Sequence, residues 1–504
     1  MSTITGVSSN LIPLIQSSLD IDNQLTDLSR QLGSGQKADT YAGLGPQSGI
    51  AMALNAQLTA IGSFDDAIST VQTNVSLQQS VLQQVDSIGG STKALLVGQP
   101  TFDIDSSGQT TTQKTAQDQL GQILDLLNTK GTDGYLFSGS GVDQPSTDTL
   151  DHILNGNGTQ AGLEQVVAER NQADLGTTPL GRLDIPAVVG STVSINEDVA
   201  GSPFGLKLAA VNSQLANAAV TGPTGALDTI SADLSGGNPN DGDTITYSFT
   251  LPDGSSQTLT LQATSSTTPG TNQFTIGATT AMTAANLQAA LAAGVTKIAS
   301  TQLPAASTMA AANDFFGDPP MRVNGAPPSG ATSLVAGSSA DTVIWYTGEN
   351  GAGSPRSTAT ARVDPTTTVS YGTRANEQGI RWIVQSVAAL AAASYSASDP
   401  NAAAEYGALT QRVNANLAVP DGVQKIGDIE ASLASAQTVM QTAQDQHKQT
   451  SNTLQDMLQS IEGVDQNEVG AKILSLQTSL SASLSTTARL AQLSLVNYLA
   501  PVNG

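Results

Sequence analysis

Cysteine is absent from the 504 residues of this chain, and positive charge and aromatic side chains are scarce. Without cysteine the chain has no disulfides, no thiolate metal sites and no cysteine nucleophile. The 19 Lys and Arg residues against 42 Asp and Glu give a net charge of −23, so the chain as a whole cannot neutralise the phosphates of a nucleic acid. Aromatic residues make up only 4% of the sequence, which favours closely packed long helices over a wide globular interior.

Long apolar runs are missing as well. No stretch approaches the roughly 18 apolar residues that a membrane-spanning helix needs, so we expect no membrane span. The first ten residues, MSTITGVSSN, contain neither the basic region nor the apolar region of a secretory signal peptide. We therefore expect any export of this chain to proceed without a Sec signal.

What the sequence does contain is a heptad pattern towards both ends. Apolar residues recur at alternating steps of three and four over residues 4–32, 50–85 and 426–464. This spacing is typical of helices that pack along a continuous seam in coiled coils. Because the pattern occurs at both ends, it predicts that the terminal helices pair with each other. The predicted interface residues are Leu11, Leu14, Ile21, Leu25, Leu28, Leu32, Ile61, Phe64, Ile68, Val71, Val75, Leu82, Ile429, Leu433, Met440, His447, Leu454, Met457, Ile461, Ile473, Leu476 and Leu480.

Glycine and proline set the expected limits of these helices. Pro13 is tolerated only in a first turn, so we expect the first helix to begin near Asn10 and to end at Gly33 and Gly35. The pair Gly89 and Gly90 should interrupt the second helix. The long C-terminal helix should run over residues 426–464 with an interruption at Gly463, and a last helix should follow it.

The middle of the chain has a different pattern. Residues 245–251 and 259–263 alternate between apolar and polar around the turn sequence Pro252, Asp253 and Gly254, which predicts a β-hairpin buried on one face. Further strands are predicted over 342–347 and 359–363, and short helices over 162–173, 284–293 and 378–393. The expected fold is mainly α: a long antiparallel coiled-coil or helical-bundle rod from residues 1–134 and 373–504, with an outer α+β lobe over 135–372 and a β-rich insertion near 222–307.

Residues suited to catalysis or metal binding are few. His152 and His447 are the only histidines and fit no HExxH pattern, so a zinc site would depend on carboxylates. His447 lies on the apolar seam, where we interpret it as a packing residue that fixes the helix register, and His152 is expected in a surface loop. The sequence Gly-Ser-Gly-Gln-Lys at 33–37 follows a helix and lacks the hydroxyl residue of a phosphate loop, so it predicts a helix-terminating turn.

The paired acids also have an ordinary interpretation. Asp65 and Asp66 are expected on a solvated helix face, and Asp103 and Asp105 in a loop without the spacing of an EF-hand. We therefore predict that the chain is not an enzyme and has no cofactor or metal site.

Four segments carry a resemblance to a known family. Residues 28–54, LSRQLGSGQKADTYAGLGPQSGIAMAL, resemble the N-terminal signature of bacterial flagellins and hook-filament junction proteins, and residues 463–499 resemble the C-terminal helix of the same superfamily. Residues 133–145, DGYLFSGSGVDQP, resemble the strand and turn after the second helix pair in the junction proteins. Residues 196–211, NEDVAGSPFGLKLAAV, are also similar to that group.

The resemblance implies a structural subunit that self-assembles through its terminal helices in an extracellular bacterial flagellum. The implied partners are other copies of the chain, hook-associated proteins and flagellin, together with a flagellar export chaperone and the flagellar secretion apparatus. An adaptor at the hook-filament junction is the favoured role, and a filament flagellin is the alternative. A secreted adhesin or fibre protein, or an intramolecular helical bundle in an ordinary soluble protein, would fit the same heptads.

Overall fold

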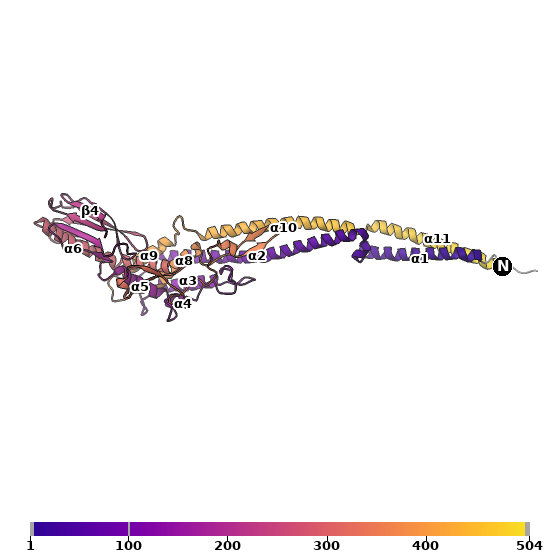
Figure 1. The fold of residues 1–504 in the computed structure, drawn as a ribbon, viewed down its shortest axis with the longest axis horizontal. Helices are drawn as coiled ribbons and strands as arrows, with labels where there is room; N and C mark the ends of the chain where they lie inside the picture. The colour runs from indigo at the N-terminus through magenta and orange to yellow at the C-terminus, as the bar shows by residue number, and fades with distance from the viewer. Residues whose placement is uncertain (1–4, 99–100, 499–504) are drawn as a thin grey trace, which may run out of the picture. The chain divides into compact units, whose positions relative to one another are not determined.

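The computed structural model describes residues 5–98 and 101–498, and the side chains of residues 12–98 and 101–492. About 52% of the chain is helical and small sheets account for a further part, so the fold is mixed α+β. The helices, including short 3₁₀ turns, are α1 (Thr5–Ser34), η1 (Tyr41–Gln47), α2 (Ser48–Leu96), α3 (Thr111–Leu127), α4 (Leu150–Asn155), α5 (Leu163–Leu175), α6 (Thr280–Ala299), α7 (Gln302–Phe315), η2 (Pro328–Gly330), η3 (Pro355–Thr358), α8 (Gln378–Ala392), α9 (Ala402–Asn416), α10 (Ile426–Glu462) and α11 (Gln466–Tyr498) (Figure 1).

The strands lie between the helical segments and form two four-stranded and two two-stranded sheets within the described residues. The strands are β1 (Leu183–Asp184), β2 (Thr192–Glu197), β3 (Lys207–Ser213), β4 (Ala219–Thr224), β5 (Thr229–Asp233), β6 (Thr244–Thr250), β7 (Ser256–Thr264), β8 (Gln273–Thr275), β9 (Met321–Val323), β10 (Leu334–Ala336), β11 (Thr360–Arg362) and β12 (Thr368–Ser370).

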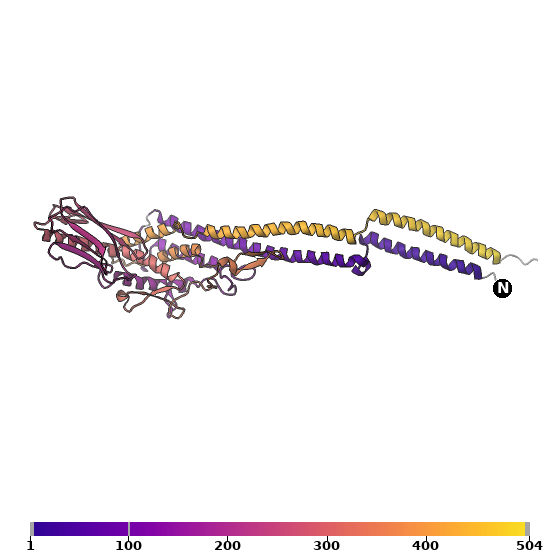
Figure 2. The same ribbon diagram turned by 45° about the horizontal axis from the view of Figure 1, so that its top comes forward.

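The chain divides into two units, and both α2 and α10 cross from one to the other. The first unit comprises residues 1–69, 362–368 and 438–504, and the second comprises residues 70–361 and 369–437. In the first unit α1 lies beside α11, drawn in indigo and yellow in Figure 2.

The core of the second unit includes a cluster built from both larger sheets and α6. One sheet has the strand order β1-β2-β5-β4 and the other β3-β6-β7-β8, with antiparallel pairing except between β7 and β8. The predicted hairpin is confirmed: β6 pairs with β7, and Ile245, Tyr247 and Phe249 are buried. The predicted β-rich insertion was expected to begin near residue 222. Strand β2 precedes that residue and pairs with β5, which follows it, so the sheet includes residues on both sides of the predicted start.

Two predicted helix limits were wrong. The first helix begins at Thr5, so Pro13 lies inside it, at the cost of one backbone hydrogen bond. The second helix continues through Gly89 and Gly90 to Leu96. A Cβ atom at Gly89 would lie 3.1 Å from Ile383 of α8, so the glycine permits close helix packing at a position that sequence periodicity marked as a break.

The predicted strand over 342–347 was absent, and so was the strand that the resemblance implies within 133–145. Residues 342–347 make isolated bridges to two different segments, Thr342 to Ala161 and Tyr346 to Thr147, so no ladder forms. Residues 133–145 likewise make only isolated bridges, through Tyr135 and Ser138. The strand at 359–363 and the helices at 162–173, 284–293 and 378–393 are confirmed as β11, α5, α6 and α8.

Candidate assembly surface

The predicted seam is the least exposed face of both terminal helices. In α1 the side chains of Leu14, Ile21, Leu25 and Leu28 are half-buried, and in α11 those of Ile473, Leu476 and Leu480 are half-buried. The hydroxyls of Ser18 and Ser483 lie 3.0 Å apart, which joins the two helices on this face. The side chain of Leu11 lies outside the described residues. The terminal helices therefore pair through the predicted positions, but the pair alone leaves those positions partly in water.

A second apolar stripe on α1 faces away from this seam. Ile12, Ile15 and Leu19 are spaced three and four residues apart, which places them on one face of the helix, and they are 59%, 51% and 57% exposed. On α11, Leu474 and Leu484 are 67% and 55% exposed. Large exposed apolar side chains grouped on one element are typical of a surface that another molecule covers.

The turn after α1 is fixed to the junction between α10 and α11. Gly35 has φ +72°, which glycine adopts without strain, and the amide of Lys37 donates to the carbonyl of Glu462 at 2.7 Å. The Lys37 ammonium donates to the carbonyls of Ser460 and Ile461 at 3.0 and 2.9 Å. A cation is favourable at the C-terminal end of a helix, so Lys37 acts as a cap for α10. The predicted helix-terminating turn at 33–37 is confirmed.

Beyond this turn, α2 packs on α10 in the first unit. Ala51, Leu54, Leu454 and Ile461 form a small buried cluster, and Ile61 is half-buried against it. His447 is buried, with its Nδ1 atom 2.7 Å from Asp65 Oδ1 and its ring centroid 6.0 Å from that of Phe64. The predicted packing position of His447 is thus confirmed, whereas Leu32 and Met457 are 39% and 46% exposed.

The remaining predicted interface residues are buried inside the chain. Their side chains pack within the fold and are not available to a neighbouring molecule. They are Ile68, Val71, Val75, Leu82, Ile429, Leu433 and Met440.

Of the other polar residues weighed as catalytic or metal-binding candidates, His152 and Asp105 make local contacts. His152 was expected in a loop, but it lies in α4, where its Nδ1 atom is 3.1 Å from Asp148 Oδ1. Asp105 is in the expected loop, and contacts with Lys114 and Ser107 hold its pKa well below the usual range. Over residues 5–98 and 101–498 no group of three or more histidine, aspartate or glutamate side chains could hold a metal ion.

Sequence reasoning missed a buried ionic cluster between α5 and α7. Arg170 donates from Nε to Asp174 at 2.8 Å and from Nη1 to Asp314 at 2.6 Å, and its side chain is 5% exposed. Burial raises the pKa of Asp314 to about 6, against the attraction of Arg170. Asp314 lies 144 residues from Arg170 in sequence, so the i,i+4 spacing of Arg170 and Asp174 on one helix face was the only local signal.

In the part of the chain that the structure describes, no helix has the length and apolarity needed to cross a membrane. Comparison with known proteins finds no matching family model and no significantly similar characterised protein.

Proposed function

We propose that this chain is a structural subunit of the bacterial flagellum that self-assembles through its terminal helices and serves as the adaptor between hook and filament. The observation that carries the proposal is the apolar stripe of Ile12, Ile15 and Leu19 on α1. These side chains point into water although α1 already has α11 as a partner. At about 25 cal/mol per Å² of apolar surface, covering such a stripe with a neighbouring subunit is favourable.

The sequence resemblances at residues 28–54 and 463–499 supply the class of assembly, and residues 133–145 and 196–211 favour the junction role. Copies of the chain, hook-associated proteins and flagellin are the proposed partners, with delivery by an export chaperone and the flagellar secretion apparatus to the cell exterior. A filament flagellin is the alternative role, because both kinds of subunit would use the same terminal helices. The proposed function needs no enzymatic activity, cofactor or metal.

The role is tested by deleting the gene in its source bacterium, provided that a separate flagellin is present. A junction adaptor should leave hooks without filaments and release flagellin into the medium, and labelled antibody should mark one band at the end of the hook. Uniform labelling along the filament would instead make the chain a filament flagellin.

The surface is tested by placing a charge in the stripe. Ile15→Asp should prevent incorporation of the exported protein, because assembly would bury an unpaired carboxylate. Gln16→Asp introduces the same charge at the adjacent exposed position and should incorporate normally. Equal incorporation of both variants would exclude the stripe as an assembly surface.

A further inference from the structure

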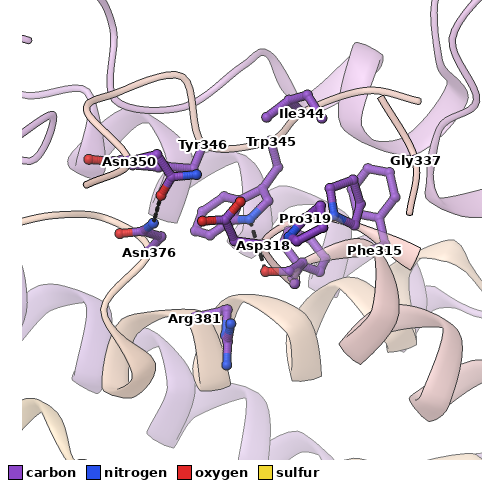
Figure 3. Close-up of a pocket in the computed structure, with 13 residues that line it drawn as sticks. Phe315, Asp318, Pro319, Gly337, Ile344, Trp345, Tyr346, Asn350, Asn376 and Arg381 are labelled. Atoms are coloured by element: carbon purple, nitrogen blue, oxygen red, sulfur yellow. Dashed lines mark hydrogen bonds between the residues drawn. The ribbon is translucent and has the colours of Figure 1, made fainter. Parts of the chain in front are cut away.

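A cavity of about 100 Å³ opens in the second unit between the end of α7, the residues that follow it, residues 344–346 and the first turn of α8 (Figure 3). Its wall is aromatic. Phe316 lies edge-on to both Phe315 and Trp345, with ring centroids 5.2 Å apart in each pair. The indole Nε1 of Trp345 already donates to the carbonyl of Phe316 at 3.2 Å. This wall therefore offers an apolar surface whose indole donor is already in use.

Polar side chains line another part of the cavity. Asn376 donates to Asn350 Oδ1 at 2.8 Å, the dashed line between them in Figure 3, and Asp318 and Arg381 complete this part of the lining. Asp318 is exposed, whereas Arg381 is half-buried. The cavity thus combines an apolar wall with a cation and amide groups.

Arg381 is the unusual member of this set. Other arginines of the second unit, among them Arg170, Arg322 and Arg374, are paired with carboxylates. The guanidinium of Arg381 has neither a hydrogen bond nor an ion pair within the described residues. Burial lowers its pKa, and the attraction of Asp318 opposes that shift without bringing the two groups into contact. A half-buried guanidinium whose donors have no protein partner has lost part of its contact with water, so its donors are available to an acceptor.

The chemistry of the lining restricts what that acceptor can be. A carboxylate presents two coplanar oxygens that match the guanidinium donors, and a single charge limits repulsion from Asp318. The aromatic wall calls for an apolar group behind the carboxylate, since a sulfate or phosphate would turn its remaining oxygens against the rings. A cavity near 150 Å³ holds a benzene ring, so about 100 Å³ suits a short aliphatic chain.

We infer that this cavity is a binding site for a short-chain monocarboxylate, with the carboxylate on Arg381 and the alkyl chain against Trp345 and Phe315. The site is formed entirely by residues of the second unit, and the inference does not depend on the proposed assembly function. Few ligand atoms are buried, so the affinity should be weak, in the millimolar range.

The inference is tested on the full chain by titrating butyrate and following tryptophan fluorescence, with Trp382→Phe used to assign the signal to Trp345. Butyrate should give a saturable change, and its neutral isostere butyramide and inorganic sulfate should bind at least tenfold more weakly. Arg381→Gln should weaken butyrate binding tenfold or more, and Asp318→Asn should strengthen it about twofold by removing a competing charge.

Arg362→Gln is the matched control, because it removes the same charge from an exposed arginine whose guanidinium donates only to the carbonyls of Asp364 and Pro365. It should leave butyrate affinity unchanged, and Arg381→Lys should retain part of it. The assignment is overturned if butyrate produces no saturable change, if Arg381→Gln binds like the parent chain, or if sulfate or butyramide binds as well as butyrate. Circular dichroism and melting of Arg381→Gln should match those of the control, so that a loss of binding reports on the site.

Discussion

His447 on α10 and Asp65 on α2 are 382 residues apart in sequence, and their side chains meet at 2.7 Å beside the ring of Phe64. The heptad pattern placed His447 on a helix seam, but it did not supply the carboxylate. The histidine side chain is 9% exposed and the aspartate side chain 40% exposed. The buried imidazole therefore has a hydrogen-bond partner that lies at the edge of the interface. Removal of the histidine should therefore also remove a hydrogen bond to Asp65.

We expect Asp65→Ala and His447→Ala to be coupled by about 1 kcal/mol in a double-mutant cycle, because each removes the same charge-assisted hydrogen bond. Urea unfolding of both single variants and the double variant measures the coupling. A cycle with Asp456→Ala, an exposed acid on α10, is the control and should be additive within about 0.5 kcal/mol. Additivity in the Asp65 cycle would show that the contact contributes nothing.

The two adjacent glycines in α2 should respond differently to alanine. Gly90→Ala should raise the free energy of unfolding by up to about 1 kcal/mol, since alanine favours helix and the new Cβ meets nothing within 4 Å. Gly89→Ala should gain less or lose stability, because its Cβ would lie 3.1 Å from Ile383. Thermal melting of the two variants compares them directly. Equal stabilisation by both would show that α8 gives way easily at Ile383.

Asp314 should make stability depend on pH. Its pKa is raised to about 6 in the folded chain from an ordinary value of 3.8, so the folded state takes up a proton at a higher pH than the unfolded state does. This contribution is therefore fully present below about pH 4 and is lost as pH rises through 6, with a magnitude on the order of 2 to 3 kcal/mol. Asp314→Asn should flatten that part of the pH profile.

Unfolding midpoints between pH 4 and 7 would measure the effect of Asp314. Asp318→Asn is the matched control, because that carboxylate is exposed and lies four residues further along the chain. An Asp314→Asn profile as steep as that of the parent chain would assign the slope to other groups.

The Lys37 cap should stabilise the end of α10. Lys37→Met keeps most of the aliphatic stem and removes the ammonium from the carbonyls of Ser460 and Ile461, so we expect a loss of about 1 kcal/mol and faster amide exchange over residues 459–463. Lys472→Met removes a lysine from an exposed ion pair with Glu468 and should cost less than about 0.5 kcal/mol. If amide exchange near Gly463 is unchanged in Lys37→Met, then Lys37 does not act as a cap for α10.

The sequence by itself determined the long helices, the helix-ending turn at 33–37 and the hairpin of β6 and β7. These features follow from local repetition, because side chains three and four residues apart share a helix face and alternate residues share a strand face. The same reasoning found the half-buried positions Leu25 and Leu476 and the buried His447. It also predicted Ile68 and Leu433 as interface residues, although both are buried inside the fold. Periodicity alone could not distinguish such buried positions from positions that remain partly exposed.

Only the tertiary structure decided the features that depend on partners distant in sequence. Gly89 lies in close contact with Ile383 of another helix, and the buried Arg170 is paired with Asp314, which reaches it from another helix. The cavity beside Arg381 is assembled from separate segments, so no spacing within any one of them predicts it. Periodicity in the sequence specifies which face of a helix or strand is apolar. The packing of side chains from distant elements decides which residues contact that face and which partner each nearby charge has.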